Sequence, residues 1–196
     1  MQSKHLDFYF DLSSPYSYLA ATQLDALAKK YAAQVAWKPM VLAAVFKAQG
    51  NVMPAVCLPK AQYMIKDLAR WAEEYGVPFR MSSHFPLPTI RAMRLVIAAE
   101  GSGQSGVLAQ RFFAAMWDRD LDISKDDVLR QLIGECGLNA DELMAATETA
   151  SVKDKLRAYT DEAISRGVFG APALVVDGEL FWGNDRLHFL EKALAK

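Results

Sequence analysis

The sequence predicts an α/β fold in which the two ends of the chain build a small sheet and the middle of the chain is helical. Near the N-terminus, apolar and polar residues alternate over residues 6–12, and apolar residues recur at helical spacing from Tyr16 onward. Near the C-terminus, two short apolar runs flank Asp177-Gly178, a strong hairpin signal. Strand–helix–strand at one end and strand–strand–helix at the other is the arrangement of a thioredoxin fold.

The N-terminal unit has clear boundaries. The strand over residues 6–12 is followed at once by Ser14-Pro15. Serine is a natural N-cap, and proline suits the first helical position because its missing N–H would have no partner there. A second strand is expected from residue 35 to about 40, so the unit is a right-handed βαβ.

The C-terminal unit is a hairpin followed by a helix. Residues 173–176 and 179–182 are expected to pair antiparallel across the turn. A closing helix then opens near Gly183, with Asn184 or Asp185 as its cap and three leucines on one face.

Between these units the periodicity is helical. With 196 residues and 21.7 kDa, the chain has the size of one domain carrying a large insertion. We expect a discontinuous thioredoxin-like domain over residues 1–45 and 166–196, with an all-helical insertion over residues 46–165. The helices expected within the insertion cover residues 63–75, 90–100, 107–117, 125–136, 140–150 and 152–166.

Composition argues against several classes of function. The 22 basic residues are balanced by 23 acidic ones, so the protein has no net positive charge that would attract nucleic acid. No apolar stretch approaches the roughly 20 residues of a membrane span, and no apolar signal core precedes the first acidic residue, so we expect a cytoplasmic location. Cys57 and Cys136 lie far apart and the three histidines are scattered, which favours neither a metal site nor a disulfide framework.

The tetrapeptide Ser14-Pro15-Tyr16-Ser17 stands where a thioredoxin-fold oxidoreductase would carry Cys-x-x-Cys. Hydroxyls at both sulfur positions exclude dithiol exchange there. A helix N-terminus still attracts an anion, and the Ser14 hydroxyl could donate a hydrogen bond to the thiolate of a bound thiol cofactor. The alternative is that Ser14 is an ordinary N-cap.

Two further features lie near the hairpin. Proline in Gly170-Ala171-Pro172 is trans if it merely begins a strand, but in a thioredoxin fold the proline at this place is characteristically cis and lies beside the first helix. The backbone of Ala171 would then be free to pair with an extended peptide. Asp185 either caps the last helix or holds an ammonium group.

Four segments together resemble a known family. They are DFYFDLSSPYSY at residues 7–18, the pair Gly50-Asn51, VFGAP at residues 168–172 and WGNDR at residues 182–186. The combination is similar to the 2-hydroxychromene-2-carboxylate isomerases and the related kappa-class glutathione transferases. These form a DsbA-like branch of the thioredoxin superfamily, and the resemblance covers essentially the whole chain.

The resemblance implies that glutathione is the cofactor. Ser14 matches the active-site serine and would face the sulfur, Ala171 would pair with the cysteinyl backbone, and Lys60 would supply positive charge to a carboxylate. Asn184 and Asp185 match the γ-glutamyl-binding pair, with Asn184 standing where kappa-class enzymes carry serine. The full set of implied glutathione contacts is Ser14, Asn51, Lys60, Ala171, Pro172, Asn184 and Asp185.

The implied activity is isomerisation of a ring-opened, benzylidene-pyruvate-like aromatic substrate by reversible thiolate addition, in a homodimer. Isomerases of this type tend to carry polar residues after the Gly-Asn pair, whereas residues 55–58 here are Ala-Val-Cys-Leu. Two alternatives remain open: a kappa-like transferase whose thioether product leaves, and a redox-inactive module that binds an extended peptide beside Pro172.

Overall fold

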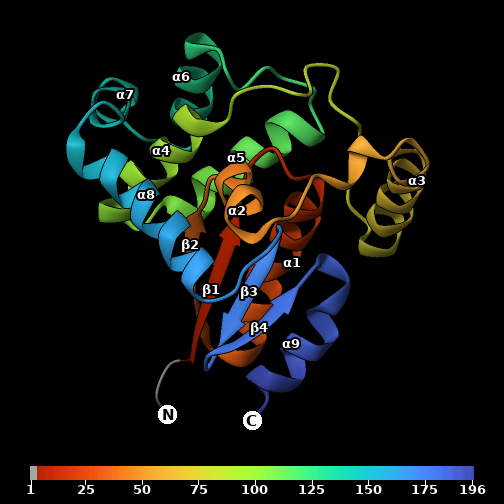
Figure 1. The fold of residues 1–196 in the computed structure, drawn as a ribbon. Helices are drawn as coiled ribbons and strands as arrows, with labels where there is room; N and C mark the ends of the chain where they lie inside the picture. The colour runs from red at the N-terminus through yellow and green to blue at the C-terminus, as the bar shows by residue number, and fades with distance from the viewer. Residues whose placement is uncertain (1–3) are drawn as a thin grey trace.

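The computed structural model describes residues 4–196, which form a four-stranded mixed sheet in the order β2-β1-β3-β4 (Figure 1). β1 (Lys4–Phe10) runs parallel to β2 (Ala33–Pro39) and antiparallel to β3 (Ala173–Val176), which pairs antiparallel with β4 (Glu179–Trp182). The sheet is that of a thioredoxin fold, so the predicted fold class is confirmed.

All the chain between β2 and β3 is helix or connection, as expected of an all-helical insertion. In Figure 1, most of these helices gather at one end of the sheet, while α3 stands to one side. The α-helices are α1 (Pro15–Tyr31), α2 (Leu42–Gln49), α3 (Leu58–Tyr75), α4 (Ile90–Ala98), α5 (Ser105–Trp117), α6 (Asp126–Glu135), α7 (Ala140–Ala146), α8 (Ala150–Ser165) and α9 (Leu187–Leu194), and the short 3₁₀ turns are η1 (Pro54–Val56), η2 (Ala99–Ser102) and η3 (Asn184–Arg186).

The structure corrects two boundaries. The first strand ends at Phe10 instead of reaching residue 12, because Leu12 already lies in the connection, where its carbonyl accepts a hydrogen bond from the Trp117 indole at 2.9 Å. The helix containing residues 63–75 begins earlier, at Leu58, with a proline in its first turn.

The predicted cap of the closing helix is wrong. Asn184 and Asp185 lie in η3, so the residue before α9 is Arg186 and no side chain caps the helix. Gly183 precedes η3 with φ +99°, and a Cβ there would collide with the Asp185 carboxylate. The chain therefore turns tightly enough to carry Asn184 and Asp185 toward α1, which packs against η3.

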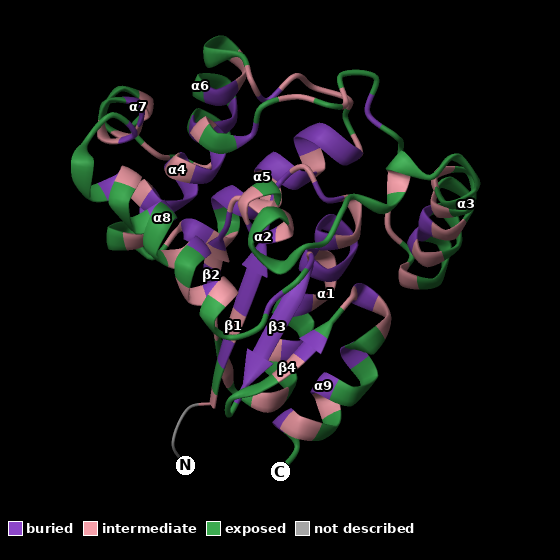
Figure 2. Ribbon diagram, in the orientation of Figure 1, coloured by how far each residue is buried: buried purple, intermediate pink, exposed green. Residues whose placement is uncertain are grey.

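Apolar side chains cover both faces of the sheet. Phe8 and Phe10 stack at 5.0 Å on the face covered by α1, α5 and α9, whereas Tyr9 points to the other face, where α2 and α8 pack. Figure 2 shows that the central strands β1 and β3 are mostly buried. Buried apolar contacts on both faces hold the helical segment against the sheet.

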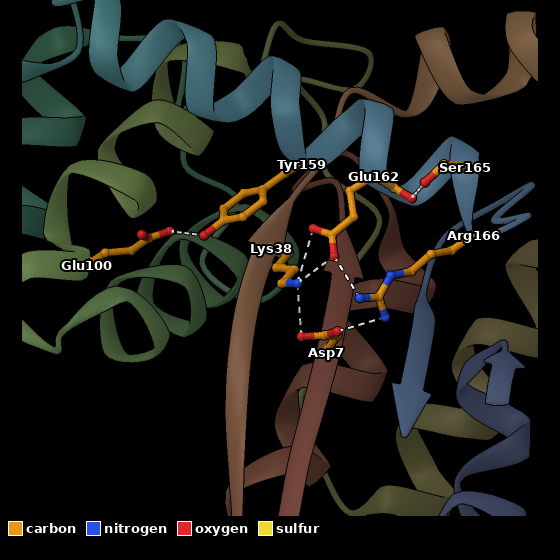
Figure 3. Close-up of polar contacts among 7 residues, drawn as sticks. All are labelled: Asp7, Lys38, Glu100, Tyr159, Glu162, Ser165 and Arg166. Carbon is orange, nitrogen blue, oxygen red and sulfur yellow. Dashed lines mark hydrogen bonds and ion pairs between the residues drawn. The ribbon is translucent and has the colours of Figure 1, made fainter. Parts of the chain in front are cut away.

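An ion-pair network fastens α8 to the sheet (Figure 3). The Lys38 ammonium on β2 lies 3.0 Å from carboxylate oxygens of Asp7 on β1 and Glu162 on α8. Arg166, just after α8, pairs with the same two carboxylates at 3.0 and 2.9 Å. Burial tends to raise the pKa of Glu162, but the hydrogen bonds from Lys38, the neighbouring Tyr9 hydroxyl and the charges of Lys38 and Arg166 together hold that pKa below its usual value.

None of the helices described over residues 4–196 is long and apolar enough to cross a membrane.

Candidate active site

Ser14 caps the N-terminus of α1, as the sequence predicts. Its backbone is extended (φ −94°, ψ 112°), its Oγ accepts the Ser17 N–H at 3.2 Å, and Pro15 occupies the first helical position. The residue is 6% exposed, and the first turn of α1 carries no acidic side chain to offset the positive end of the helix dipole. A buried hydroxyl therefore lies at an electropositive helix end.

The segment before β3 lies against this serine. The Ala171–Pro172 peptide bond is cis, as a thioredoxin fold implies. The Ser14 hydroxyl donates a long hydrogen bond of 3.4 Å to the Ala171 carbonyl, across 157 positions of sequence. Within the described part of the chain the Ala171 N–H has no hydrogen-bond partner, so it can pair with the backbone of a ligand.

The Gly183 N–H donates to the Pro172 carbonyl at 3.0 Å, so the next residues, Asn184 and Asp185 of η3, follow directly after a contact with the cis-proline segment. Asn184 is 2% exposed, and its Nδ2 is buried without a hydrogen-bond partner among residues 4–196. Asp185 is half-buried and pairs with Arg186. A buried amide left without a partner is a donor available to a ligand.

Asn51 reaches the site through a different contact. Its Nδ2 donates to the Phe169 carbonyl at 2.8 Å, two residues before Ala171, and its Oδ1 accepts the Val52 N–H at 2.8 Å. Asn51 comes one residue after Gly50, the C-cap that ends α2 with φ +65°. The contact with Phe169 therefore brings Asn51 to the segment that faces Ser14.

Lys60 is the predicted site residue that the structure does not tie to the others. It is exposed in the first turn of α3 and makes no hydrogen bond or ion pair within the described residues. Its ammonium is therefore free to meet an anion, but no hydrogen bond or ion pair joins it to Ser14, Ala171 or Asn184.

Two tyrosines that the sequence reasoning missed connect α3 to the site. The Tyr16 hydroxyl donates to Asp67 at 2.9 Å, and the Tyr75 hydroxyl donates to the Asn184 carbonyl at 2.7 Å. Burial raises the pKa of both hydroxyls, and the hydrogen bond to the Asp67 carboxylate raises that of Tyr16 further. Both tyrosines therefore act as neutral donors that hold α3 beside α1 and η3.

Ser14 lines neither of two hollows on the surface of residues 4–196. One, of about 540 Å³, runs along β4 and α9 and includes Phe169, Trp182 and Phe189. The other, of about 490 Å³, lies at the edge of β2 beside the start of α5. Among residues 4–196 no three histidine, cysteine or acidic side chains gather as metal ligands.

These features define a class: a thioredoxin-fold protein in which a serine replaces the dithiol at the helix end facing a cis-proline. A family model described as DSBA-like thioredoxin domain matches residues 5–195. The 2-hydroxychromene-2-carboxylate isomerase of Sphingobium xenophagum is 34% identical over 194 residues, which are 98% of each chain. The chain therefore belongs to the DsbA-like thioredoxin family, in its group of 2-hydroxychromene-2-carboxylate isomerases and the related kappa-class glutathione transferases.

Further comparisons agree with this assignment. Glutathione S-transferase kappa 1 of Rattus norvegicus is 28% identical, covering 97% of this chain and 91% of its own. A solved structure of a selenomethionine 2-hydroxychromene-2-carboxylate isomerase superposes with a TM-score of 0.89 at 30% identity, covering 97% of this chain and 94% of that one.

Proposed function

We propose that this protein is a glutathione-dependent isomerase of the 2-hydroxychromene-2-carboxylate isomerase type. The observation that carries the proposal is the Ser14 hydroxyl at the N-terminus of α1, facing the Ala171 carbonyl beside a cis-proline, in a chain that matches such an isomerase over nearly its whole length. A serine there can stabilise a thiolate but cannot form a disulfide.

The residues present fit glutathione. The Asn184 amide is a buried donor without a partner in the described part of the chain, and the Asp185 carboxylate beside it suits an ammonium group. The Ala171 N–H is available to the cysteinyl backbone, and the exposed Lys60 ammonium to a carboxylate. The Asn51 amide, already bonded to the Phe169 carbonyl, supports the segment that would carry the ligand.

When bound, glutathione would supply a thiolate nucleophile that adds reversibly to an activated double bond, so that the bond can rotate before the thiolate is expelled. The Ser14 hydroxyl, whose bond to Ala171 is long, would be free to donate to the sulfur, and the N-terminus of α1 would add its partial positive charge. A pKa lowered by about one unit increases the thiolate about tenfold at neutral pH.

The substrate that we propose is a ring-opened aromatic compound of the benzylidene-pyruvate kind. Apolar side chains are exposed along the connection into α3, close after Asn51: Val52, Met53, Val56 and Leu58 are 42% to 69% exposed. Exposed apolar side chains grouped in this way suit contact with an aromatic ring.

The test is turnover with glutathione supplied well below the substrate concentration. We expect many turnovers per glutathione, with the substrate brought to equilibrium with its geometric isomer and all of the thiol still titratable at the end. Conversion that requires no glutathione would refute it.

A kappa-class-like transferase is the second candidate, favoured by the 28% identity to glutathione S-transferase kappa 1. The same thiolate site serves both reactions, but a transferase consumes one glutathione for each product. In the same experiment its conversion would stop when the thiol is exhausted.

Calorimetry distinguishes the proposed enzyme from the third candidate, a redox-inactive module that binds peptides. The proposed site recognises the γ-linked glutamyl group through Asn184 and Asp185, so glutathione should bind much more tightly than the α-linked tripeptide Glu-Cys-Gly. A module that pairs only with the backbone beside Pro172 would bind both peptides equally.

A further inference from the structure

Asp11 is a buried carboxylate at the end of β1, three residues before Ser14. It is 5% exposed, and a charge at such depth is stable only when its oxygens are hydrogen-bonded. Its Oδ1 accepts the Ser13 N–H at 2.9 Å, the Ser13 hydroxyl at 2.9 Å and the Thr89 hydroxyl at 2.8 Å. Its Oδ2 accepts the Leu42 N–H at 3.1 Å.

These donors belong to the starts of three helices. Ser13 precedes the cap of α1, and Leu42 is the first residue of α2. The residue before α2 is Val41, which has no side-chain capping group. Asp11, just after β1, accepts the Leu42 N–H and so caps α2 from a distant part of the chain. Thr89 precedes α4, and its hydroxyl donates to Asp11 and makes no capping bond to its own helix.

A closed set of contacts runs from Asp11 back to Ser14. α2 is held at its start by Asp11, and Asn51, directly after its end, bonds the Phe169 carbonyl at 2.8 Å. Two residues further on, the Ala171 carbonyl accepts the bond from the Ser14 hydroxyl. The start of α2 and the Ser14 turn therefore share one carboxylate as hydrogen-bond acceptor, while α2 is also held against α8, where the Thr160 hydroxyl accepts the Val41 N–H at 3.0 Å.

We propose that Asp11 is a positioning residue that fixes the Ser14 turn relative to the start of α2. In this way it keeps Asn51 and Ser14 at the separation that a shared ligand needs. Only the identity of that ligand, glutathione, rests on the proposed function. The bonds that Asp11 makes are present in the protein without any ligand.

The primary test is amide hydrogen exchange of the ligand-free protein. In Asp11→Asn the amide group places a donor against the Leu42 N–H, so that hydrogen bond is lost while the side-chain volume is kept. We expect exchange at least about tenfold faster in residues 12–18 and 42–51, with exchange in the sheet unchanged.

Asp7→Asn is the matched control. Asp7 lies on the same strand and is partly buried, but its partners are Lys38 and Arg166, away from the Ser14 turn. We expect this variant to lose stability without faster exchange in residues 12–18 and 42–51.

Leu42→Pro removes the bond between Asp11 and α2 without changing Asp11. It therefore keeps the proposal testable if the Asp11 variant misfolds. Proline is well tolerated at the first helical position, where it removes the N–H that Asp11 accepts. It also removes the half-buried Leu42 side chain, so Leu42→Ala, which shortens that side chain and keeps the N–H, is compared with it. We expect the same faster exchange over residues 43–51.

Glutathione calorimetry on the same proteins adds a second readout. We expect the affinity to fall about tenfold in Asp11→Asn and Leu42→Pro and to change less than about twofold in Asp7→Asn. Unchanged exchange in both segments, or an equal rise throughout the chain, overturns the role of Asp11. A wild-type protein that does not bind glutathione overturns the proposed function instead, and the exchange data still decide the role of Asp11.

Discussion

Replacing Ser14 with alanine removes one hydroxyl that caps α1 and that we propose to bind the glutathione thiolate. The first task is structural: the Oγ caps α1 by accepting the Ser17 N–H at 3.2 Å. Loss of such a cap costs about 1 kcal/mol, which for a chain of this size lowers Tm by about 2–4 °C. The bond to Ala171, at 3.4 Å, is too long to add much.

The second task is chemical and is expected to cost more. In the proposed complex, the sulfur of glutathione would keep the field of α1 without the hydroxyl but would lose its proposed donor. We expect the pKa of the bound thiol to rise by about one unit and kcat to fall about tenfold to a hundredfold. The assay is a pH titration of the thiolate absorbance of bound glutathione, with turnover measured in parallel.

Two further variants separate these tasks. Ser14→Asn keeps a good N-cap without a hydroxyl, so it should retain the wild-type Tm and lose turnover as alanine does. Ser17→Ala, three residues later in the same helix, removes a buried hydroxyl with no partner among the described residues and should leave both unchanged. Near-normal turnover in Ser14→Ala with glutathione bound would refute the reasoning.

Three other predictions concern the surroundings of the site. Asn184→Ala removes a buried amide whose Nδ2 has no partner among the described residues. We expect calorimetry to show about tenfold weaker glutathione binding and urea unfolding to show little loss of stability. A large loss of stability with intact binding would contradict this. Gly170→Ala places a Cβ 2.7 Å from the Trp182 indole nitrogen and should destabilise the fold by about 1–3 kcal/mol. Gly134→Ala, in open space on α6, should stabilise the fold slightly. Thermal unfolding compares the two variants, and equal effects on stability would count against the packing argument. The pKa of Glu162 is lowered in the folded chain from its ordinary 4.5, so its contribution to stability is fully present above that pH and is lost as the pH falls through the folded pKa. The difference in free energy of unfolding between wild type and Glu162→Gln should therefore shrink on acidification, and a difference that stays constant would show that the charge of Glu162 is not responsible.

Local signals in the sequence predicted the ends of the chain well. The hairpin matches its expected limits because Asp177 and Gly178 both adopt positive φ, 49° and 82°, as this turn requires. Ser14-Pro15 likewise begins α1 as expected. In each case the signal lies within a few residues of the structure that it determines.

The parts that escaped prediction depend on contacts between distant segments. The cap of α2 comes from Asp11, 31 positions earlier, so nothing next to Leu42 marks the start of that helix. Tyr75 bonds the Asn184 carbonyl across 109 positions. The expected capping by Asn184 or Asp185 failed because Gly183 turns the chain into a 3₁₀ turn before α9 begins.

The residue set of the candidate site was predicted from resemblance to a family, and the structure adds their mutual contacts. Ser14 lies against Ala171, and Asn51 bonds the carbonyl two residues before it. Lys60, which is exposed and makes no bond within the described chain, keeps its assigned role as a prediction.

The most direct test of the account is the location of the sulfur in a crystal structure with glutathione bound. The account predicts the sulfur within hydrogen-bond distance of the Ser14 hydroxyl, the cysteinyl backbone paired with Ala171, and the γ-glutamyl group against Asn184 and Asp185. Glutathione bound in the hollow between β4 and α9, or with its sulfur turned away from Ser14, would contradict it.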